Sequence, residues 1–166
     1  VSRYTMISGP SDQILEGLSG NTEAEKAAAL EQSMTAMDQM VEMFYAHKGL
    51  STASDAEPHN RVPAGRLNIR YQRMFAGAFM YAGGLHIGIE WPQFKEMVNG
   101  KPVIADAEGR YQSGSLFGWG LSHEIGHEIN EGAYAVAEVT NNYYPLLAQA
   151  RDTNDSLRFK YEDVFK

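Results

Sequence analysis

The feature that most constrains this chain is the pentapeptide His-Glu-Ile-Gly-His at residues 123–127. In a helix, residues four positions apart lie one above the other on the same face, so the imidazoles of His123 and His127 can converge on one metal ion. Glu124 lies beside that ion, where a carboxylate can act as a general base on a water molecule. The chain must therefore keep an intact helix here, and the motif is typical of zinc hydrolases.

The residues around the pentapeptide support a helix that ends at about Asn130, with Ser113 or Ser115 as the cap. An apolar row recurs at four-residue steps and consists of Phe117, Leu121, Ile125 and Ile129. Trp119, His123 and His127 form a second row, roughly opposite the first. The pattern predicts an apolar back that packs on a core and a polar front that can bind metal. Glycines within such a helix, Gly126 among them, usually mark close packing.

A catalytic zinc takes three protein ligands and keeps one open position, so a third ligand is needed. Glu128 is turned about 100° from His127, given 3.6 residues per turn. Glu131 lies on the histidine face, but at a rise of about 12 Å from His123 it is too far for ligand bonds of about 2 Å. Neither carboxylate fits the position.

Glu138 is the predicted third ligand. It follows a helix break at Gly132 and is expected on a second helix, over residues 133–150, that folds back toward the histidines. Asn142, four residues later, is expected to hydrogen-bond a ligating histidine or the Glu138 carboxylate. Pro145 predicts a kink in this second helix or a helix boundary just before it. Three further residues are candidates for substrate or oxyanion contacts, namely His86, Tyr134 and Tyr143.

Two runs of alternating apolar residues, 66–72 and 85–91, predict half-buried strands. Glycines before and within the second run would let another backbone approach, as a sheet edge does when it receives an extended peptide. An ordinary strand with a bend or bulge is the alternative. Toward the N-terminus, the Thr22-x-x-Glu25 capping box predicts a helix over residues 22–47. A short helix is expected at 10–18 and a loop at 50–64.

Composition narrows the function classes. The 166 residues carry a net charge of -7 without a basic run, which argues against a nucleic-acid partner. No apolar run approaches the roughly 20 residues that span a bilayer, so membrane insertion is not expected. Because the chain has no cysteine, histidines and carboxylates must hold any metal. Nothing in the sequence specifies an oligomeric state, and the amphipathic segment 155–166 stops without a stop signal, as in a piece of a larger domain.

The stretch HEIGHEINEGAYAVAEVTNNYY resembles the enhancin-like, mucin-degrading zinc metallopeptidases, which are of the gluzincin type. In that family the HExxH motif is followed, after a variable gap, by a glutamate in a Glu-Val-Thr-x-Asn context, which residues 138–142 match. The resemblance implies one zinc ion held by His123, His127 and Glu138, with Glu124 as the base. The upstream run AGGLHIGIE looks like the family's glycine-rich segment.

The resemblance also implies a fold and a substrate class. The expected fold is α+β and zincin-like, a small twisted sheet backed by helices, with residues 1–166 as a single catalytic domain that lacks part of a C-terminal helical subdomain. The expected enzymes are secreted or attached to the bacterial cell surface and cleave O-glycosylated, mucin-like proteins near a glycan-bearing Ser or Thr. Two alternatives stay open, a general gluzincin protease without a glycan requirement and a non-catalytic zinc- or glycan-binding fragment.

Overall fold

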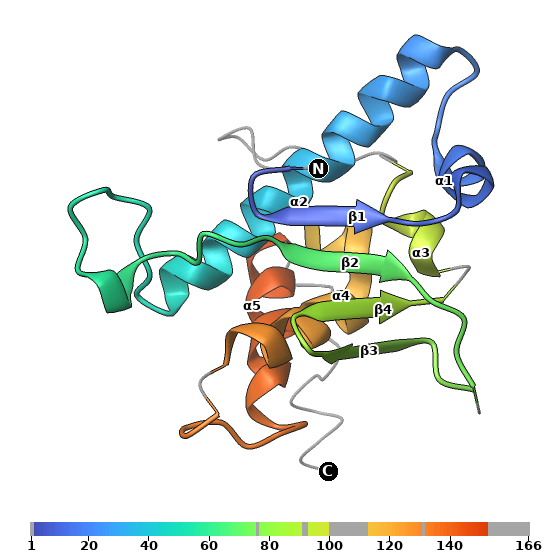
Figure 1. The fold of residues 1–166 in the computed structure, drawn as a ribbon. Coiled ribbons are helices and arrows are strands. Elements are labelled where there is room, and N and C mark those ends of the chain that lie inside the picture. Colours follow the sequence, from blue (N-terminus) through green and yellow to red (C-terminus); the bar gives the residue numbers. More distant parts are fainter. Residues whose placement is uncertain (1, 76, 91–92, 100–112, 131, 153–166) are drawn as a thin grey trace.

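The computed structural model describes residues 2–75, 77–90, 93–99, 113–130 and 132–152. Its elements, in chain order, are β1 (Thr5–Ser8), α1 (Ser11–Gly17), α2 (Glu23–His47), η1 (Pro58–Asn60), β2 (Leu67–Tyr71), β3 (Met80–Gly83), β4 (His86–Ile89), α3 (Gln93–Glu96), α4 (Ser113–Ile129), η2 (Thr140–Asn142) and α5 (Tyr143–Asp152). In Figure 1 the sheet lies in front, and α2, α4 and α5 lie behind it. The predicted α+β architecture, a small sheet backed by helices, is confirmed.

Within the described residues the sheet has four strands, in the order β1-β2-β4-β3. β1 pairs with β2 and β2 with β4 in parallel, whereas β3 pairs with β4 antiparallel. The expectation that residues 85–91 form a sheet edge that receives a peptide is therefore wrong, because β4 is paired on both sides. Gly88 in β4 instead leaves room for the Tyr81 ring, which a Cβ at that position would strike. The edge strand near α4 is β3.

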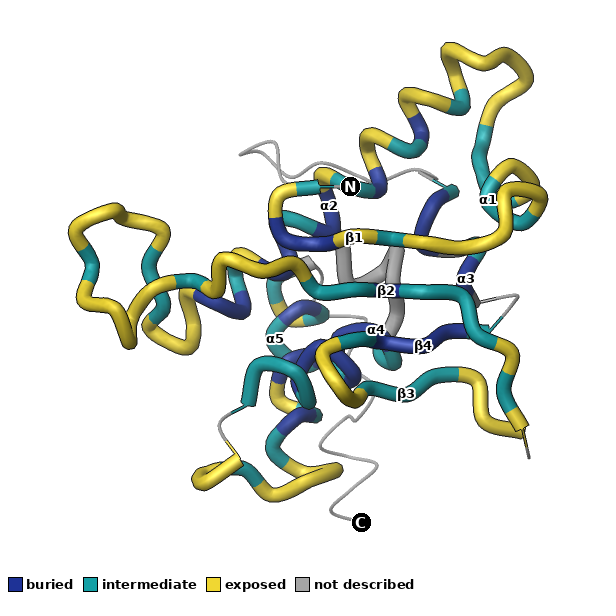
Figure 2. The backbone as a smooth tube through the Cα atoms, viewed as in Figure 1, coloured by how far each residue is buried: buried dark blue, intermediate teal, exposed yellow. Residues whose placement is uncertain are grey.

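One face of the sheet packs against helices because its strands alternate. Ile69, Ile87 and Ile89 are fully buried and belong to one apolar core with residues of α2 and α4. The helical members of this core include Met37, Met40, Val41, Phe44, Leu121 and Ile125. Figure 2 shows the buried segments gathered between the sheet and these helices. The core thus fixes α4, which carries the HExxH motif, directly behind the sheet.

Most of the predicted elements are confirmed. The Thr22 side chain accepts from the Glu25 N–H at 3.2 Å, and the Glu25 carboxylate accepts from the Thr22 N–H at 2.9 Å, so the capping box starts α2 as expected. The short helix predicted at 10–18 is α1, and the two alternating runs are β2 and β4. The predicted loop at 50–64 contains the single helical turn η1 and an isolated bridge between Ser51 and Arg61. The helix that carries the motif is α4.

The predicted helix over residues 133–150 is wrong in its first half. Residues 132–139 form turns, η2 follows, and α5 begins only at Tyr143, so Glu138 does not lie on a helix. Backbone bonds here are those of isolated turns, such as the one from the Thr140 N–H to the Val136 carbonyl, and side chains add to them. Thr140 Oγ1 accepts from the Val136 N–H, and the Asn142 amide donates to the Glu138 carbonyl. The boundary expected before Pro145 is confirmed, since proline in the first turn of α5 removes no helical hydrogen bond.

Two strands have no counterpart in the predictions, β1 and β3, each of four residues. Their alternation is too short to stand out, and they become strands by pairing with β2 and β4. The amphipathic segment predicted at 155–166 lies outside the described residues. Among the residues that are described, no helix has the length and apolar character needed to cross a membrane.

Candidate metal centre

α4 brings the two histidines of the motif together. His123 and His127 are one helical turn apart, and their ring centroids lie 5.0 Å from each other. The opposite face of the helix is anchored by Leu121 and Ile125, which are buried in the core. Because the apolar face is fixed, the histidine face is directed away from the core toward the segment 132–142.

Glu138 reaches the same point from that segment. Its Oε2 lies 3.0 Å from His123 Nε2, and its Oε1 lies 3.1 Å from His127 Nε2. One donor atom from each of the three residues lies within 4.8 Å of the others. Glu138 achieves this with φ at 62°, in the left-handed region that non-glycine residues rarely adopt. The third-ligand candidate therefore meets the two histidines, although not from a helix.

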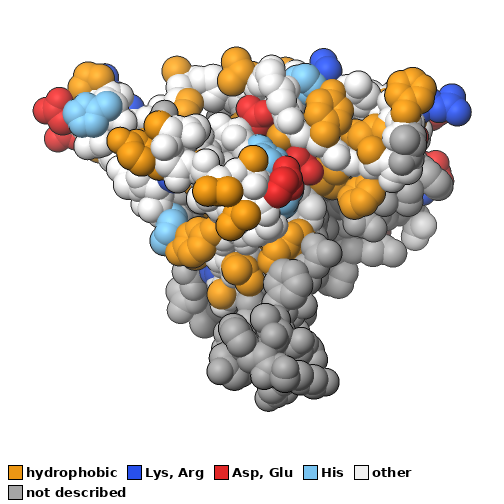
Figure 3. All heavy atoms as spheres, turned by 90° about the horizontal axis from the view of Figure 1, so that it is seen from below, with side chains coloured by type: hydrophobic (Ala, Val, Ile, Leu, Met, Phe, Trp, Pro, Cys, Tyr) orange, Lys and Arg blue, Asp and Glu red, His pale blue; other side chains and the backbone are white. Residues whose placement is uncertain are grey.

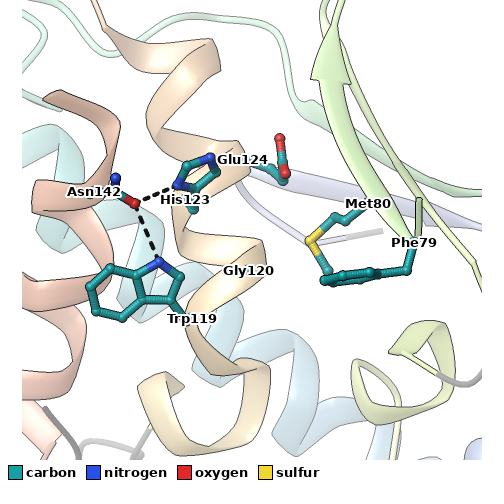
Figure 4. A pocket seen from close by; sticks show the side chains of 7 residues that line it. All are labelled: Phe79, Met80, Trp119, Gly120, His123, Glu124 and Asn142. Atoms are coloured by element: carbon teal, nitrogen blue, oxygen red, sulfur yellow. Dashed lines mark hydrogen bonds between the residues drawn. The ribbon is translucent and has the colours of Figure 1, made fainter. Parts of the chain in front are cut away.

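Asn142 sets the protonation pattern of His123. The Asn142 Oδ1 accepts from His123 Nδ1 at 2.6 Å and from Trp119 Nε1 at 3.3 Å, as Figure 4 shows. With its proton on Nδ1, the neutral imidazole of His123 presents the Nε2 lone pair toward Glu138. The Asn142 amide also donates to the Glu138 carbonyl at 2.6 Å. Asn142 thus connects a histidine to the backbone of the segment that carries Glu138.

The donors fit a divalent metal ion such as zinc. Two imidazole nitrogens and a carboxylate are the ligands that zinc takes when no thiolate is present, and this chain has no cysteine. The Nε2 lone pair of His123 faces the Glu138 oxygen at 3.0 Å, which is unfavourable unless a cation or a proton lies between them. His123, His127 and Glu138 are the residues that could hold such an ion.

Glu124 lies beside this cluster and is enclosed. It is only 9% exposed, and burial raises the pKa of its carboxyl above the usual value. His123 and His127 oppose this rise in the pKa, as does the hydrogen bond from the Ala82 N–H in β3. A carboxyl whose pKa is moved toward neutrality is suited to accept and return a proton.

A hollow of about 510 Å³ opens beside His123 and Glu124. It is lined by Phe79, Met80, Trp119, Gly120, His123, Glu124 and Asn142. Figure 4 shows Phe79 and Met80 on one side and Trp119 with Asn142 on the other. In Figure 3, histidine and acidic side chains lie together near the middle of one face, with hydrophobic side chains around them. His123 and Glu124 thus face a hollow that a substrate can enter.

The remaining site candidates lie elsewhere. His86 is bonded to Arg70 and Tyr81, with its Nε2 2.8 Å from Arg70 Nη2 and 2.7 Å from the Tyr81 hydroxyl. Because strands alternate, His86 lies on the sheet face opposite the buried Ile87. It is near Glu128 of α4, where it opposes the rise that burial causes in the pKa of that carboxyl, and not at the metal cluster.

Tyr134 and Tyr143 line a different hollow, together with His47, Lys48, Asn130, Ala135, Thr140 and Tyr144. Neither tyrosine lines the hollow in front of His123. The structure therefore does not bring these two residues, or His86, to the metal cluster.

Sequence reasoning missed several residues at the site. Phe79 and Met80 line the hollow, but Met80 starts a strand too short to recognise and Phe79 comes just before it. Asn141 is buried against both histidines, and its only signal was its place between Glu138 and Asn142. The glycine signal in the helix was correct, because a Cβ at Gly126 would lie 2.7 Å from the Asn141 carbonyl oxygen.

Comparison with known families decides what kind of chain carries this centre. The family described as Peptidase M60, enhancin and enhancin-like matches residues 19–165. The chain belongs to the enhancin-like M60 peptidase family. The match covers α2, the strands β2, β3 and β4 and every residue of the candidate centre, whereas β1 lies before it. No curated protein sequence matches this M60 chain at a significant level.

Solved structures resemble this M60 chain over most of its length. A functionally unknown conserved protein from Bacillus anthracis str. Ames is 20% identical, with 90% of this chain and 27% of that chain covered, at a TM-score of 0.67. The catalytic module of the metalloprotease ZmpA from Clostridium perfringens is 20% identical, at a TM-score of 0.61. The match covers 89% of this chain and 25% of the ZmpA chain. These likenesses show the shared fold.

The M60 catalytic domain of Clostridium perfringens ZmpC, solved in complex with the sialyl T antigen, is 25% identical. The match covers 76% of this chain and 23% of the ZmpC chain, at a TM-score of 0.55. The chain therefore spans about a quarter of the length of these structures.

Proposed function

We propose that this chain carries the catalytic centre of a zinc endopeptidase that cleaves O-glycosylated, mucin-like proteins near a glycan-bearing Ser or Thr. The observation that carries the proposal is the convergence of His123, His127 and Glu138 beside the buried carboxylate of Glu124. Two histidines and a carboxylate, with space in front of them, leave one position of an ion open, as catalytic zinc sites do. One zinc ion per chain is the proposed cofactor.

The residues around the proposed ion have separate roles. When bound, zinc lowers the pKa of a water molecule and polarises the scissile carbonyl. Glu124 accepts the proton of the attacking water and returns it to the leaving amine. Asn142 holds His123 in the tautomer that presents Nε2. His86, Tyr134 and Tyr143 lie apart from this cluster, so we assign none of them to the oxyanion.

The edge of β3 supplies a place for a peptide. β3 is the last strand in the order β1-β2-β4-β3, and its outer edge has no strand partner among the described residues. Met80, the first residue of this strand, and Phe79 just before it line the hollow in front of Glu124. An extended substrate can pair with such an edge through its backbone and place side chains against the apolar wall. This arrangement supports an endopeptidase.

A glycoprotein substrate is supported by the family and by one relative. The M60 catalytic domain of ZmpC was solved in complex with the sialyl T antigen, a glycan. We propose that this chain likewise acts on glycosylated protein and that it acts outside the cell, secreted or attached to the bacterial surface, where such substrates lie. We propose no nucleic-acid or membrane partner.

The test compares the protein with Glu124→Gln on an O-glycosylated mucin and on the same mucin after enzymatic deglycosylation. We expect the unaltered protein to cut only the glycosylated form. Glu124→Gln should keep its zinc but lose about 100- to 10,000-fold in rate, the usual contribution of a general base. Full-rate cleavage by a zinc-loaded Glu124→Gln protein would show that the mechanism is wrong.

Two other functions are outcomes of the same experiment. Equal cleavage of both substrate forms would favour a general gluzincin protease, which the apolar wall formed by Phe79, Met80 and Trp119 also suits. Zinc binding without cleavage of any glycoprotein would favour a zinc- or glycan-binding fragment.

A further inference from the structure

Four polar side chains form a cluster on the sheet face opposite the buried Ile87, and no step of the proposed reaction uses them. At the centre of this Tyr81 cluster is the Tyr81 hydroxyl of β3, which donates to Gln72 Oε1 at 2.5 Å and lies 2.7 Å from His86 Nε2 of β4. Arg70 Nη2 of β2 lies 3.5 Å from the same hydroxyl and 2.8 Å from His86 Nε2. One side chain of β3 is thus bonded to β4 and, across it, to residues of β2 and just after it.

The glycine in β4 lets Tyr81 reach so far. Tyr81 is directly opposite Gly88, and Gly88 is in turn paired with Arg70 of β2. A Cβ at Gly88 would strike the Tyr81 ring, so the ring lies over a position that has no side chain. The hydroxyl at the far end of the ring can therefore cross β4 and meet β2. This contact explains the glycine within the alternating run 85–91.

The residues on either side of Tyr81 present their backbone groups to the free edge of β3. The Glu90 N–H donates to the Phe79 carbonyl at 2.9 Å, and these two residues continue the antiparallel register of β3 and β4. Because hydrogen-bonded and non-hydrogen-bonded pairs alternate, Tyr81 also directs its N–H and C=O toward β4. Met80 and Ala82 direct theirs the other way, toward the edge that has no strand partner among the described residues.

Side-chain contacts decide how firmly this edge strand is held. β3 has four residues, and β4 is its one strand partner within the described part of the chain. Backbone pairing on one side leaves the other side open, so cross-strand side chains carry more of the strand's stability. On the side of α4, the Ala82 N–H donates to the Glu124 carboxylate. On the other face the Tyr81 hydroxyl holds the strand, one residue before Ala82.

We propose that Tyr81 is a positioning residue for substrate binding, a role that rests on the proposed peptidase function. Its hydroxyl, bonded across Gly88 to the neighbouring strands, holds β3 so that the backbone groups of Met80 and the Ala82 carbonyl can pair with an extended peptide. Glu124 is carried by α4 and not by β3. The Tyr81 cluster therefore acts on substrate affinity and not on the chemical step.

The test is steady-state kinetics on an O-glycosylated peptide, with the zinc content of each protein measured. Tyr81→Phe keeps the ring over Gly88 and removes the hydroxyl. We expect KM to rise about 2- to 10-fold, the range that corresponds to the loss of a hydrogen bond. The kcat should change less than about twofold, because loss of uniform binding raises KM alone. Hydrogen exchange at the Tyr81 amide should become faster, since β3 separates from β4 more often.

Two glycine variants test the same contact from the other side. Gly88→Ala keeps every polar group of the Tyr81 cluster but displaces the Tyr81 ring, so KM should rise as it does in Tyr81→Phe. Gly83→Ala is the matched control on β3, because a Cβ there meets nothing within 4 Å, and KM should not change. Thermal melts report whether each variant folds.

A binding measurement separates affinity from turnover. The same peptide is titrated into zinc-loaded Glu124→Gln protein, which should bind it without cutting it. Adding Tyr81→Phe to this variant should raise Kd by the same factor as it raises KM.

Two results would overturn the role of Tyr81 and leave the proposed function intact. An unchanged KM and Kd in Tyr81→Phe would make the hydroxyl a group that only stabilises the sheet. A fall in kcat at constant KM would place its effect on the chemical step. By contrast, an unaltered, zinc-loaded protein that neither cuts nor binds the peptide would overturn the proposed function, and the role of Tyr81 with it.

Discussion

The two halves of the candidate centre are built in different ways. The α4 half, residues 119–127, is a regular helix whose back is buried in the core, and its Glu124 is 9% exposed. The turn half, residues 132–142, consists of turns and the short helix η2, and the side chain of its Glu138 is 70% exposed. Both halves nevertheless deliver their donors to the same point.

The difference lies in what holds each half. Backbone hydrogen bonds and core packing set the α4 half before any metal is present. The turn half has only the backbone bonds of isolated turns, and side-chain bonds and contact with Gly126 add to them. The side-chain bonds run from the Val136 N–H to Thr140 Oγ1 and from the Asn142 amide to the Glu138 carbonyl. We expect the rigid α4 half to orient the irregular turn half and so complete the metal site. Each prediction below tests this difference between the halves.

Removal of a ligand from each half should have the largest effect. We expect His127→Ala to abolish one-to-one zinc binding, because it removes a donor that the helix places in advance. Glu138→Ala should weaken binding without abolishing it, since both imidazoles stay in position. Zinc per chain after dialysis, with chelator competition, measures both. If Glu138→Ala loses more zinc affinity than His127→Ala, the α4 half is not the more important half of the site.

Loss of the hydrogen bond between His123 and Asn142, which joins the two halves, should have the second-largest effect. Asn142→Ala removes the acceptor of His123 Nδ1 and should weaken zinc binding about 10- to 100-fold, the usual cost of losing a group that orients a metal ligand. Asn142→Asp keeps an acceptor oxygen and should restore most of the affinity. If the two variants bind zinc equally well, Asn142 does not orient His123.

A methyl group at Gly126 should force the halves apart. Gly126→Ala would place a Cβ 2.7 Å from the Asn141 carbonyl oxygen and 2.8 Å from the Tyr144 ring. Such overpacking costs about 1–3 kcal/mol, more than a helix gains from the glycine-to-alanine change. Gly132→Ala is the control, because a Cβ there meets nothing within 4 Å. Urea unfolding of both variants should show a loss of stability only in Gly126→Ala.

The strained backbone of Glu138 should give the smallest effect. Its φ of 62° costs a non-glycine residue about 1 kcal/mol, a cost that glycine avoids. Glu138→Gly should therefore make the metal-free protein slightly more stable than Glu138→Ala does, while both variants lose the carboxylate. Thermal melts in the presence of a chelator compare them. Equal stability would indicate that the turn half carries no such strain.

Much of the fold could be predicted because it is encoded over short distances along the chain. The four-residue steps of Leu121 and Ile125 define α4, and the exchange of hydrogen bonds between Thr22 and Glu25 starts α2. The alternation in β2 and β4 separates a buried face from a polar one. Local periodicity also brought His123, Glu124 and His127 to one surface. The need for a third ligand beyond the break at Gly132 indicated Glu138 with Asn142, and the family resemblance agreed with that choice.

What remained depends on contacts between distant parts of the chain. β1 and β3 are strands only because β2 and β4 pair with them, and this pairing made β3 the edge. Local propensity favoured a helix through Glu138, but bonds from Thr140 and Asn142, together with contact at Gly126, hold those residues in turns. Asn141 enters the centre for the same reason. A helix is determined by residues that are close in the sequence, because its hydrogen bonds join residues four apart. The turn half instead takes its shape from the surface of α4 on which it packs.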